Sequence, residues 1–166
     1  FTEQLAETRA EAVGEFDRPD LEVVNRQTRV LLHFGFGAEA RETLTAFAVQ
    51  PPDADLWQAM GAIVDGDAVG PDNPFAGQAD CDTNAAMWSV LSRPTLRLAD
   101  QPRAAAVLRA FSGLPVGLRR HLGPGLAEWF LSIGDAASAR SVRDAILRAP
   151  GDPGDAAILA EARIDL

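Results

Sequence analysis

The sequence has no lysine, no tyrosine, a single cysteine and no long hydrophobic run. All fifteen basic residues are arginine, and they stand against 24 aspartates and glutamates, which gives a net charge of −9. Nucleic acids and anionic membranes bind basic surfaces, so this acidity argues against either of them as the main partner. No apolar run reaches the length that a bilayer-spanning helix needs, and we therefore expect no direct membrane insertion of this segment.

Cys81 alone can form neither an internal disulfide nor a cysteine-based metal cluster. It leaves open a disulfide-linked dimer, and with it a homo-oligomer. The chain also begins at Phe1 rather than at methionine. We therefore expect that a preceding segment has been removed, and a signal peptide or a membrane anchor is the kind of segment that fits.

Alanine is abundant, with 30 of the 166 residues, and β-branched residues rarely cluster, which favours helix. Apolar residues recur at helical spacing, and short turns between the helices make neighbours antiparallel. We expect an all-α fold, a right-handed superhelix of antiparallel helical hairpins with no significant sheet. The pattern predicts about nine or ten short helices, which lie at residues 2–13, 21–32, 38–48, 56–64, 84–91, 102–111, 116–122 and 155–164, with a further pair within 125–151.

That pair is the clearest helical hairpin, and its two helices meet at a tight corner formed by Gly134 and Asp135. Gly123, Pro124 and Gly125 precede it and are predicted to end the helix at 116–122. Comparing the chain with itself aligns the hairpin with an earlier segment. Gly35-x4-Ala40-Arg41-x5-Phe47 matches Gly134-x4-Ala139-Arg140-x5-Ile146 without gaps. Glycine can adopt the left-handed conformation that ends a helix, and alanine lets the next helix approach closely.

One segment does not follow this pattern. Residues 65–82 are acidic and rich in glycine, proline and asparagine, and we interpret them as an irregular insertion in a single helical repeat domain of residues 1–166. A calcium loop beginning at Asp65 and Asp67 is the alternative. Val69 and Ala76 stand where further ligands belong, so we favour a solvated acidic loop and expect no metal.

The spacing of the repeat resembles a degenerate tetratricopeptide (TPR) repeat. Trp57-x2-Met60-Gly61-x2-Val64 fits the first helix of that family's consensus. Gly35, Ala40 and Pro52 fit the second helix of another copy. A third copy is fitted in part by Leu126, Phe130, Gly134 and Ala139, with Pro150 one residue from the expected place of the closing proline. The resemblance covers about half of the chain and implies an α-solenoid of helical hairpins that binds proteins or peptides.

Catalytic signatures are missing from the sequence: it has no nucleophile elbow, no dinucleotide-binding glycine motif and no phosphate-binding loop. Cys81 has no base nearby in the sequence, and His33 and His121 have no partners at metal-ligand spacing. We therefore assign no catalytic, cofactor-binding or metal-binding residue and expect a protein that is not an enzyme.

Three residues are candidates for contacts with a partner. Phe75 is a large apolar ring in the middle of the polar segment, where it needs either a pocket or a partner. Arg119 and Arg120 form a basic step in an acidic chain and could hold a carboxylate, although solvation at the surface is the simpler interpretation. The three tryptophans lie on predicted helices, where we favour a role in the core.

These observations favour a non-enzymatic scaffold whose concave surface holds a protein or peptide partner. One alternative is a regulatory or accessory helical fragment of a larger envelope protein or enzyme. Another is a small-molecule-binding or hydrolytic all-α domain. The alanine- and arginine-rich helices resemble helical-repeat proteins of α-proteobacteria, many of which are envelope proteins, and this resemblance implies a bacterial protein that is periplasmic or extracytoplasmic rather than cytoplasmic.

Overall fold

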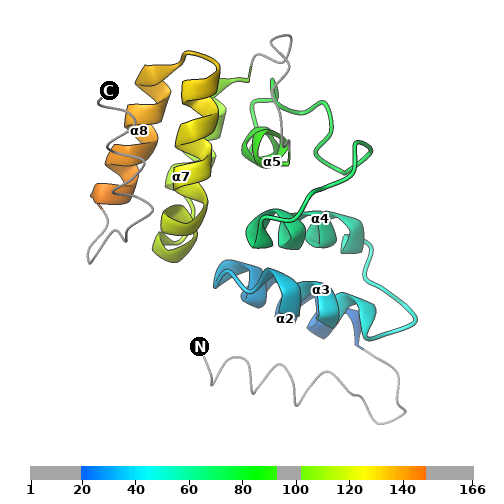
Figure 1. Ribbon diagram of the computed structural model, residues 1–166. Helices are drawn as coiled ribbons and strands as arrows, with labels where there is room; N and C mark the ends of the chain where they lie inside the picture. Colours follow the sequence, from blue (N-terminus) through cyan, green and yellow to red (C-terminus); the bar gives the residue numbers. More distant parts are fainter. Residues whose placement is uncertain (1–19, 93–101, 149–166) are drawn as a thin grey trace. The chain divides into compact units, whose positions relative to one another are not determined.

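The computed structural model describes residues 20–92 and 102–148 (Figure 1). These residues form seven helices and no strand, which confirms the predicted all-α fold. The predicted helices at 2–13 and 155–164 lie outside the described residues. The chain divides into two compact units, Phe1–Pro74 and Phe75–Leu166, and the boundary falls within the segment that the sequence predicts to be irregular.

The described part of the first unit contains α2 (Leu21–His33), α3 (Gly37–Thr45) and α4 (Ala54–Asp65). Asp20 caps α2, because its carboxylate accepts hydrogen bonds from the amides of Glu22 and Val23 at 2.9 and 3.4 Å. α3 ends at Thr45, short of the predicted residue 48. The half-buried ring of Trp57 packs against two clusters of buried residues, which are Val24, Leu44 and Ala54 and then Leu31, Leu32 and Ala40.

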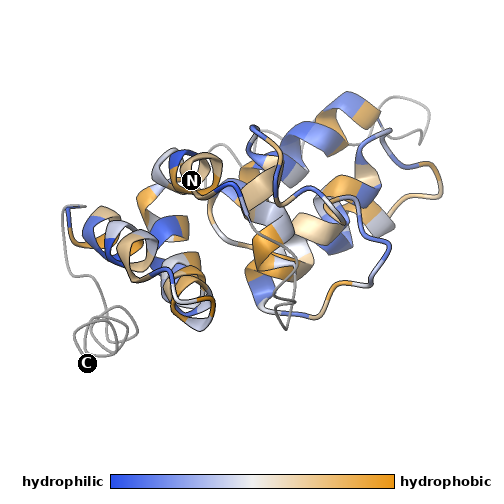
Figure 2. Ribbon diagram, turned by 90° about the horizontal axis from the view of Figure 1, so that it is seen from above, coloured by the Kyte–Doolittle hydropathy of each residue, from blue (hydrophilic) through white to orange (hydrophobic). Residues whose placement is uncertain are grey.

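The second unit contains α5 (Ala85–Leu91), α6 (Ala104–Ser112), α7 (Val116–Ser132) and α8 (Ala136–Leu147). Figure 2 shows hydrophobic and hydrophilic residues on the same helices, as expected for amphipathic helices around a core. Among the described residues, no helix is long and apolar enough to cross a membrane. The largest fully buried side chains of α6, α7 and α8 form the centre of this unit and are Val107, Phe111, Leu126, Phe130, Val142 and Ile146.

The predicted break at Gly123-Pro124-Gly125 is wrong, because α7 continues through Pro124 as one helix. Proline lacks an N–H, so one hydrogen bond of the helix is lost there. Packing on both sides of the proline compensates: Leu122 and Leu126 are both buried. Gly123 is buried as well, and a Cβ built on it would lie 2.5 Å from Cδ1 of Ile146 in α8. This glycine allows close helix packing instead of ending a helix.

The two segments that align in the sequence form the same turn between two helices. Gly35 and Gly134 have φ angles of 84° and 80°, in the left-handed region. The amide of each glycine donates to the carbonyl three residues earlier, at 3.1 and 2.9 Å, and the next amide donates to the carbonyl five residues earlier, at 3.0 and 2.9 Å. This is the Schellman arrangement of a helix end. Ala40 and Ala139, which follow at the same distance in the sequence, are both fully buried.

Candidate functional site

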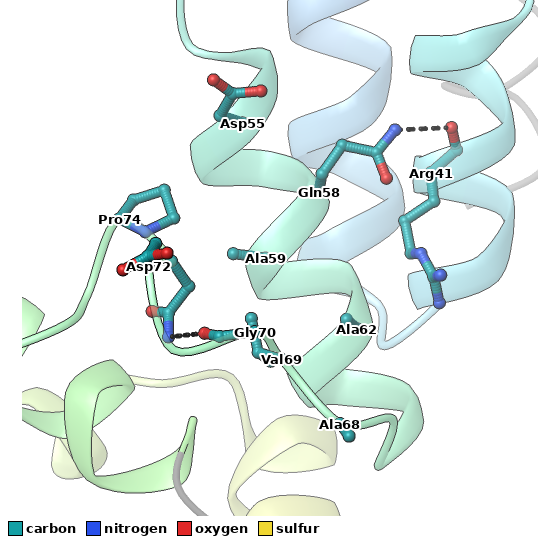
Figure 3. A pocket seen from close by; sticks show the side chains of 11 residues that line it. Arg41, Asp55, Gln58, Ala59, Ala62, Ala68, Val69, Gly70, Asp72 and Pro74 are labelled. Carbon is teal, nitrogen blue, oxygen red and sulfur yellow. Dashed lines mark hydrogen bonds between the residues drawn. The ribbon is translucent and has the colours of Figure 1, made fainter.

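A surface groove runs along α4 in the first unit, with a volume of about 410 Å³. We call it the α4 groove. Figure 3 shows Asp55 and Gln58 on α4, Asp72 and Pro74 on the loop beside it, and Arg41 on the α3 side of α4. The remaining lining residues are small or apolar apart from one asparagine, and they are Ala59, Ala62, Ala68, Val69, Gly70 and Asn73.

The loop that forms one wall of the groove begins with a third glycine turn. Gly66 has a φ of 76° and ends α4 with the same pattern of hydrogen bonds as Gly35 and Gly134. The amide of Gly66 donates to the carbonyl of Ile63, and the amide of Asp67 donates to the carbonyl of Ala62. Further along, the backbone amide and the side-chain amide of Asn73 both donate to the carbonyl of Gly70, at 3.2 and 2.7 Å. These local bonds fix a turn opposite Ala59 and Ala62, whose small side chains leave the groove open.

Arg41 reaches the groove from α3 because α4 leaves room for its side chain. A Cβ built on Gly61 would lie 2.7 Å from Cγ of Arg41, so only glycine leaves space for the arginine stem at this point. The guanidinium then pairs with Asp67 at 2.5 Å and with Asp65 at 3.6 Å. Gln58 of α4 donates to the backbone carbonyl of Arg41 at 3.2 Å and holds the two helices in register. Arg41 is therefore partly neutralised where it borders the groove.

The other two charged residues of the groove are carboxylates. Asp55 lies in the first turn of α4, and Asp72 lies in the loop; both are exposed. Within residues 20–92 and 102–148, neither carboxylate forms an ion pair or accepts a hydrogen bond. With Arg41 occupied by Asp65 and Asp67, the groove presents two uncompensated negative charges to a ligand.

The described residues of the two units differ in charge. Residues 20–74 contain nine carboxylates and three arginines, a net charge of −6 with His33 neutral. The described residues after Pro74 contain five carboxylates and seven arginines, a net charge of +2 with His121 neutral. The overall acidity of the described chain is therefore concentrated in the unit that holds the α4 groove.

Three of the five aspartates in the segment 65–82 pair with arginines that lie far from them in the sequence. Asp65 and Asp67 pair with Arg41, and Asp82 pairs with Arg109 and, at 3.8 Å, with Arg103. The hydrogen bond and charge of Arg109, with a smaller contribution from Arg103, lower the pKa of Asp82 below its usual value of 3.8. In the part of the chain that the structure describes, no group of three or more histidine, cysteine or carboxylate residues could hold a metal ion.

Of the three partner contacts predicted from the sequence, Phe75 occupies a pocket of its own unit. Its side chain is 3% exposed and stacks on Trp88 of α5, with the ring centroids 6.1 Å apart and the ring planes at 27°. Trp88 is also buried, which agrees with its expected place in the core. The sequence left open whether Phe75 fills a pocket or contacts a partner, and in the structure it fills a pocket. The ring anchors the irregular segment to α5.

Arg119 and Arg120 lie on α7 and are both half-buried. A guanidinium nitrogen of Arg119 donates to the backbone carbonyl of Ala145, in the last turn of α8, at 3.3 Å. A cation at the C-terminal end of a helix complements both the unpaired carbonyls and the helix dipole. Arg119 therefore serves the packing of α7 against α8, and neither arginine belongs to the α4 groove.

No pattern in the sequence predicted the α4 groove, although Trp57-x2-Met60-Gly61 lies on the helix that forms one wall and the irregular segment contains the loop that forms the other. Comparison with protein-family models, with curated proteins and with solved structures found no match for this chain. The resemblance to TPR repeats and the right-handed superhelix therefore stay predictions.

Proposed function

We propose that this chain is a non-enzymatic interaction module that binds a segment of a protein or peptide in the α4 groove. The observation that carries the proposal is the groove itself, an open surface channel of about 410 Å³ between one helix and a loop fixed by its own hydrogen bonds. Its volume is in the range of ligand-binding pockets, roughly 300 to 1,000 Å³. It has room for one or two side chains of an extended segment rather than for a whole folded domain.

The lining supports a peptide ligand. Small and apolar side chains such as Ala59, Ala62 and Val69 offer a surface on which a peptide can bury its own apolar atoms. Polar groups at the margins, from Asp55, Gln58 and Asp72, can fix the orientation of the ligand. The surrounding helices supply a rigid framework, because Gly37 and Gly61 bring α3 and α4 into direct backbone contact.

A selection from a random heptapeptide phage library on the purified chain tests the proposal. An enriched peptide is then titrated into the ¹⁵N-labelled chain, and the changes in backbone amide shifts are mapped on the sequence. We expect the largest changes in residues 55–74. Failure to enrich any peptide over an unrelated acidic protein would overturn the proposal, and so would shift changes concentrated in the second unit.

A further inference from the structure

We propose that the α4 groove selects a cationic segment, with an arginine or lysine side chain of the bound peptide between Asp55 and Asp72. This inference rests on the proposed function and adds the chemistry of the partner. It starts from the different states of the four aspartates around the groove. Asp65 and Asp67 are paired with Arg41, whereas Asp55 and Asp72 have no ion pair within the described residues.

Arg41 is poorly placed to bind an anionic ligand. Figure 3 shows it on the α3 side of α4, away from Asp72 and Pro74. An anion at the guanidinium would share it with Asp67, which lies 2.5 Å from Nη1, and with Asp65, and would approach the carboxylates of the groove. Like charges at short range disfavour such a complex. The same arrangement leaves a cation with two acceptors and no competing arginine.

The shape of the groove suits long basic side chains. Arginine and lysine bury their methylene stems against apolar surface while the charged head stays in a polar environment. Ala59, Ala62 and Val69 provide the apolar surface, and the carboxylates of Asp55 and Asp72 provide the polar ends. Arginine has a planar head that can donate two hydrogen bonds to one carboxylate, which favours it over lysine.

Long-range electrostatics act in the same direction. The described residues of the first unit have a net charge of −6, which attracts a cationic segment before contact and raises its local concentration. This attraction is screened by salt, with a Debye length of about 8 Å at physiological ionic strength. The affinity for a cationic peptide should therefore fall as salt is added, and the affinity for a neutral peptide should change little.

The test uses three nonapeptides of glycine, alanine and leucine that differ only in their three central residues, which are arginine, citrulline or glutamate. Citrulline has the shape of arginine without its charge. Binding to the ¹⁵N-labelled chain is followed by amide shifts, which detect millimolar affinities. We expect the arginine peptide to bind with shifts in residues 55–74, and the citrulline and glutamate peptides to bind more weakly or not at all.

Variants identify the carboxylates responsible. Asp55→Asn and Asp72→Asn should each lower the affinity for the arginine peptide roughly threefold, the effect of losing one exposed ion pair. The double variant should lower this affinity more than either single variant. Glu42→Gln is the matched control: it removes one charge from the same unit at an exposed residue outside the groove, and we expect at most a small change in affinity. Circular dichroism confirms that each variant is folded.

Three results would overturn the inference. Equal binding of the arginine and citrulline peptides, unaffected by the double variant, would leave the peptide-binding function standing but remove the cation. Stronger binding of the glutamate peptide, lost in Arg41→Gln, would make the groove an anion site. Absence of binding by all three peptides would refute the cationic ligand, while the phage selection would decide separately whether the groove binds peptides.

Discussion

Gly61 of α4 lies directly against Arg41 of α3. A Cβ built on Gly61 would lie 2.7 Å from Cγ of Arg41 and 2.9 Å from the backbone carbonyl oxygen of Gly37, both closer than real Cβ contacts. This contact joins the packing of the first unit to the candidate site, because the same arginine continues to Asp65 and Asp67 beside the α4 groove.

Gly61→Ala should therefore destabilise the first unit, although alanine is the better helix former in isolation. We expect a loss of about 1 to 3 kcal/mol, the range for overpacking in a well-packed interior. Urea unfolding followed by Trp57 fluorescence in a variant that lacks the other two tryptophans measures it. Gly70→Ala, where a new Cβ meets no atom within 4 Å, is the control with little expected effect. A Gly61→Ala variant as stable as its parent would contradict the close approach of the two helices.

Gly134 and Gly125 lie in the same helical hairpin, and replacing each of them by alanine should change the stability of the second unit in opposite directions. Gly134→Ala creates no clash, yet it forces alanine to a φ of 80° and should destabilise the second unit by about 1 kcal/mol. Gly125→Ala, in the interior of α7 with open space around it, should stabilise the unit by roughly 0.5 to 1 kcal/mol. Thermal unfolding of both variants gives the signs. If Gly134→Ala stabilised the unit as Gly125→Ala is expected to do, Gly134 would not need its left-handed conformation.

The ion pairs of Asp82 should contribute to the stability of the fold in a way that depends on pH. Arg109 and Arg103 hold the folded-state pKa of Asp82 below 3.8, so this contribution to stability is present above that pH and is lost as the pH falls through the folded-state pKa. An NMR titration of the Asp82 carboxyl group should give a pKa below 3.8, and Arg109→Gln should raise it. A pKa of 3.8 or higher in the parent chain, or one that Arg109→Gln leaves unchanged, would refute the pairing.

Substitution of Phe75 tests whether its ring belongs to the core or contacts a partner. Phe75→Ala removes a ring that is buried on Trp88, and we expect a loss of about 3 to 5 kcal/mol in the second unit together with a change in Trp88 fluorescence. Phe75→Leu keeps most of the apolar volume and should lose less. If Phe75→Ala left the stability of the chain unchanged but abolished peptide binding, the ring would contact a partner, which is the second of the two roles that the sequence suggested for it.

The sequence predicted those features that depend on neighbouring residues. The helix predicted at residues 21–32 is observed as α2, because the Asp20 side-chain cap and the left-handed Gly35 act within one turn of its ends. The repeat was visible because Gly35 and Gly134 serve the same local geometry, followed in each case by a buried alanine.

Features that depend on tertiary packing were missed. Pro124 has the local signature of a helix end, but Gly123 packs against Ile146 from another helix and α7 continues. The α4 groove exists because the turn at residues 70–73 lies opposite the small residues of α4, and no local pattern places a turn against a particular helix. Opposite charge is the signal for the ion pairs Arg41–Asp67 and Arg109–Asp82, but the partners lie 26 and 27 positions apart, so no local spacing identifies them among the fifteen arginines.

The most direct test of the central claim compares two glycine-to-phenylalanine variants in peptide binding. Gly70 lines the α4 groove and Gly117 lies on α7; each has open space for a side chain and neither has a left-handed φ. We expect Gly70→Phe to fill the groove and to lower the affinity for the enriched peptide at least tenfold, about 1.4 kcal/mol. Gly117→Phe should bind the peptide with the affinity of the parent chain. Unchanged binding by Gly70→Phe, in a variant shown to be folded, would contradict the claim that the α4 groove is the binding site.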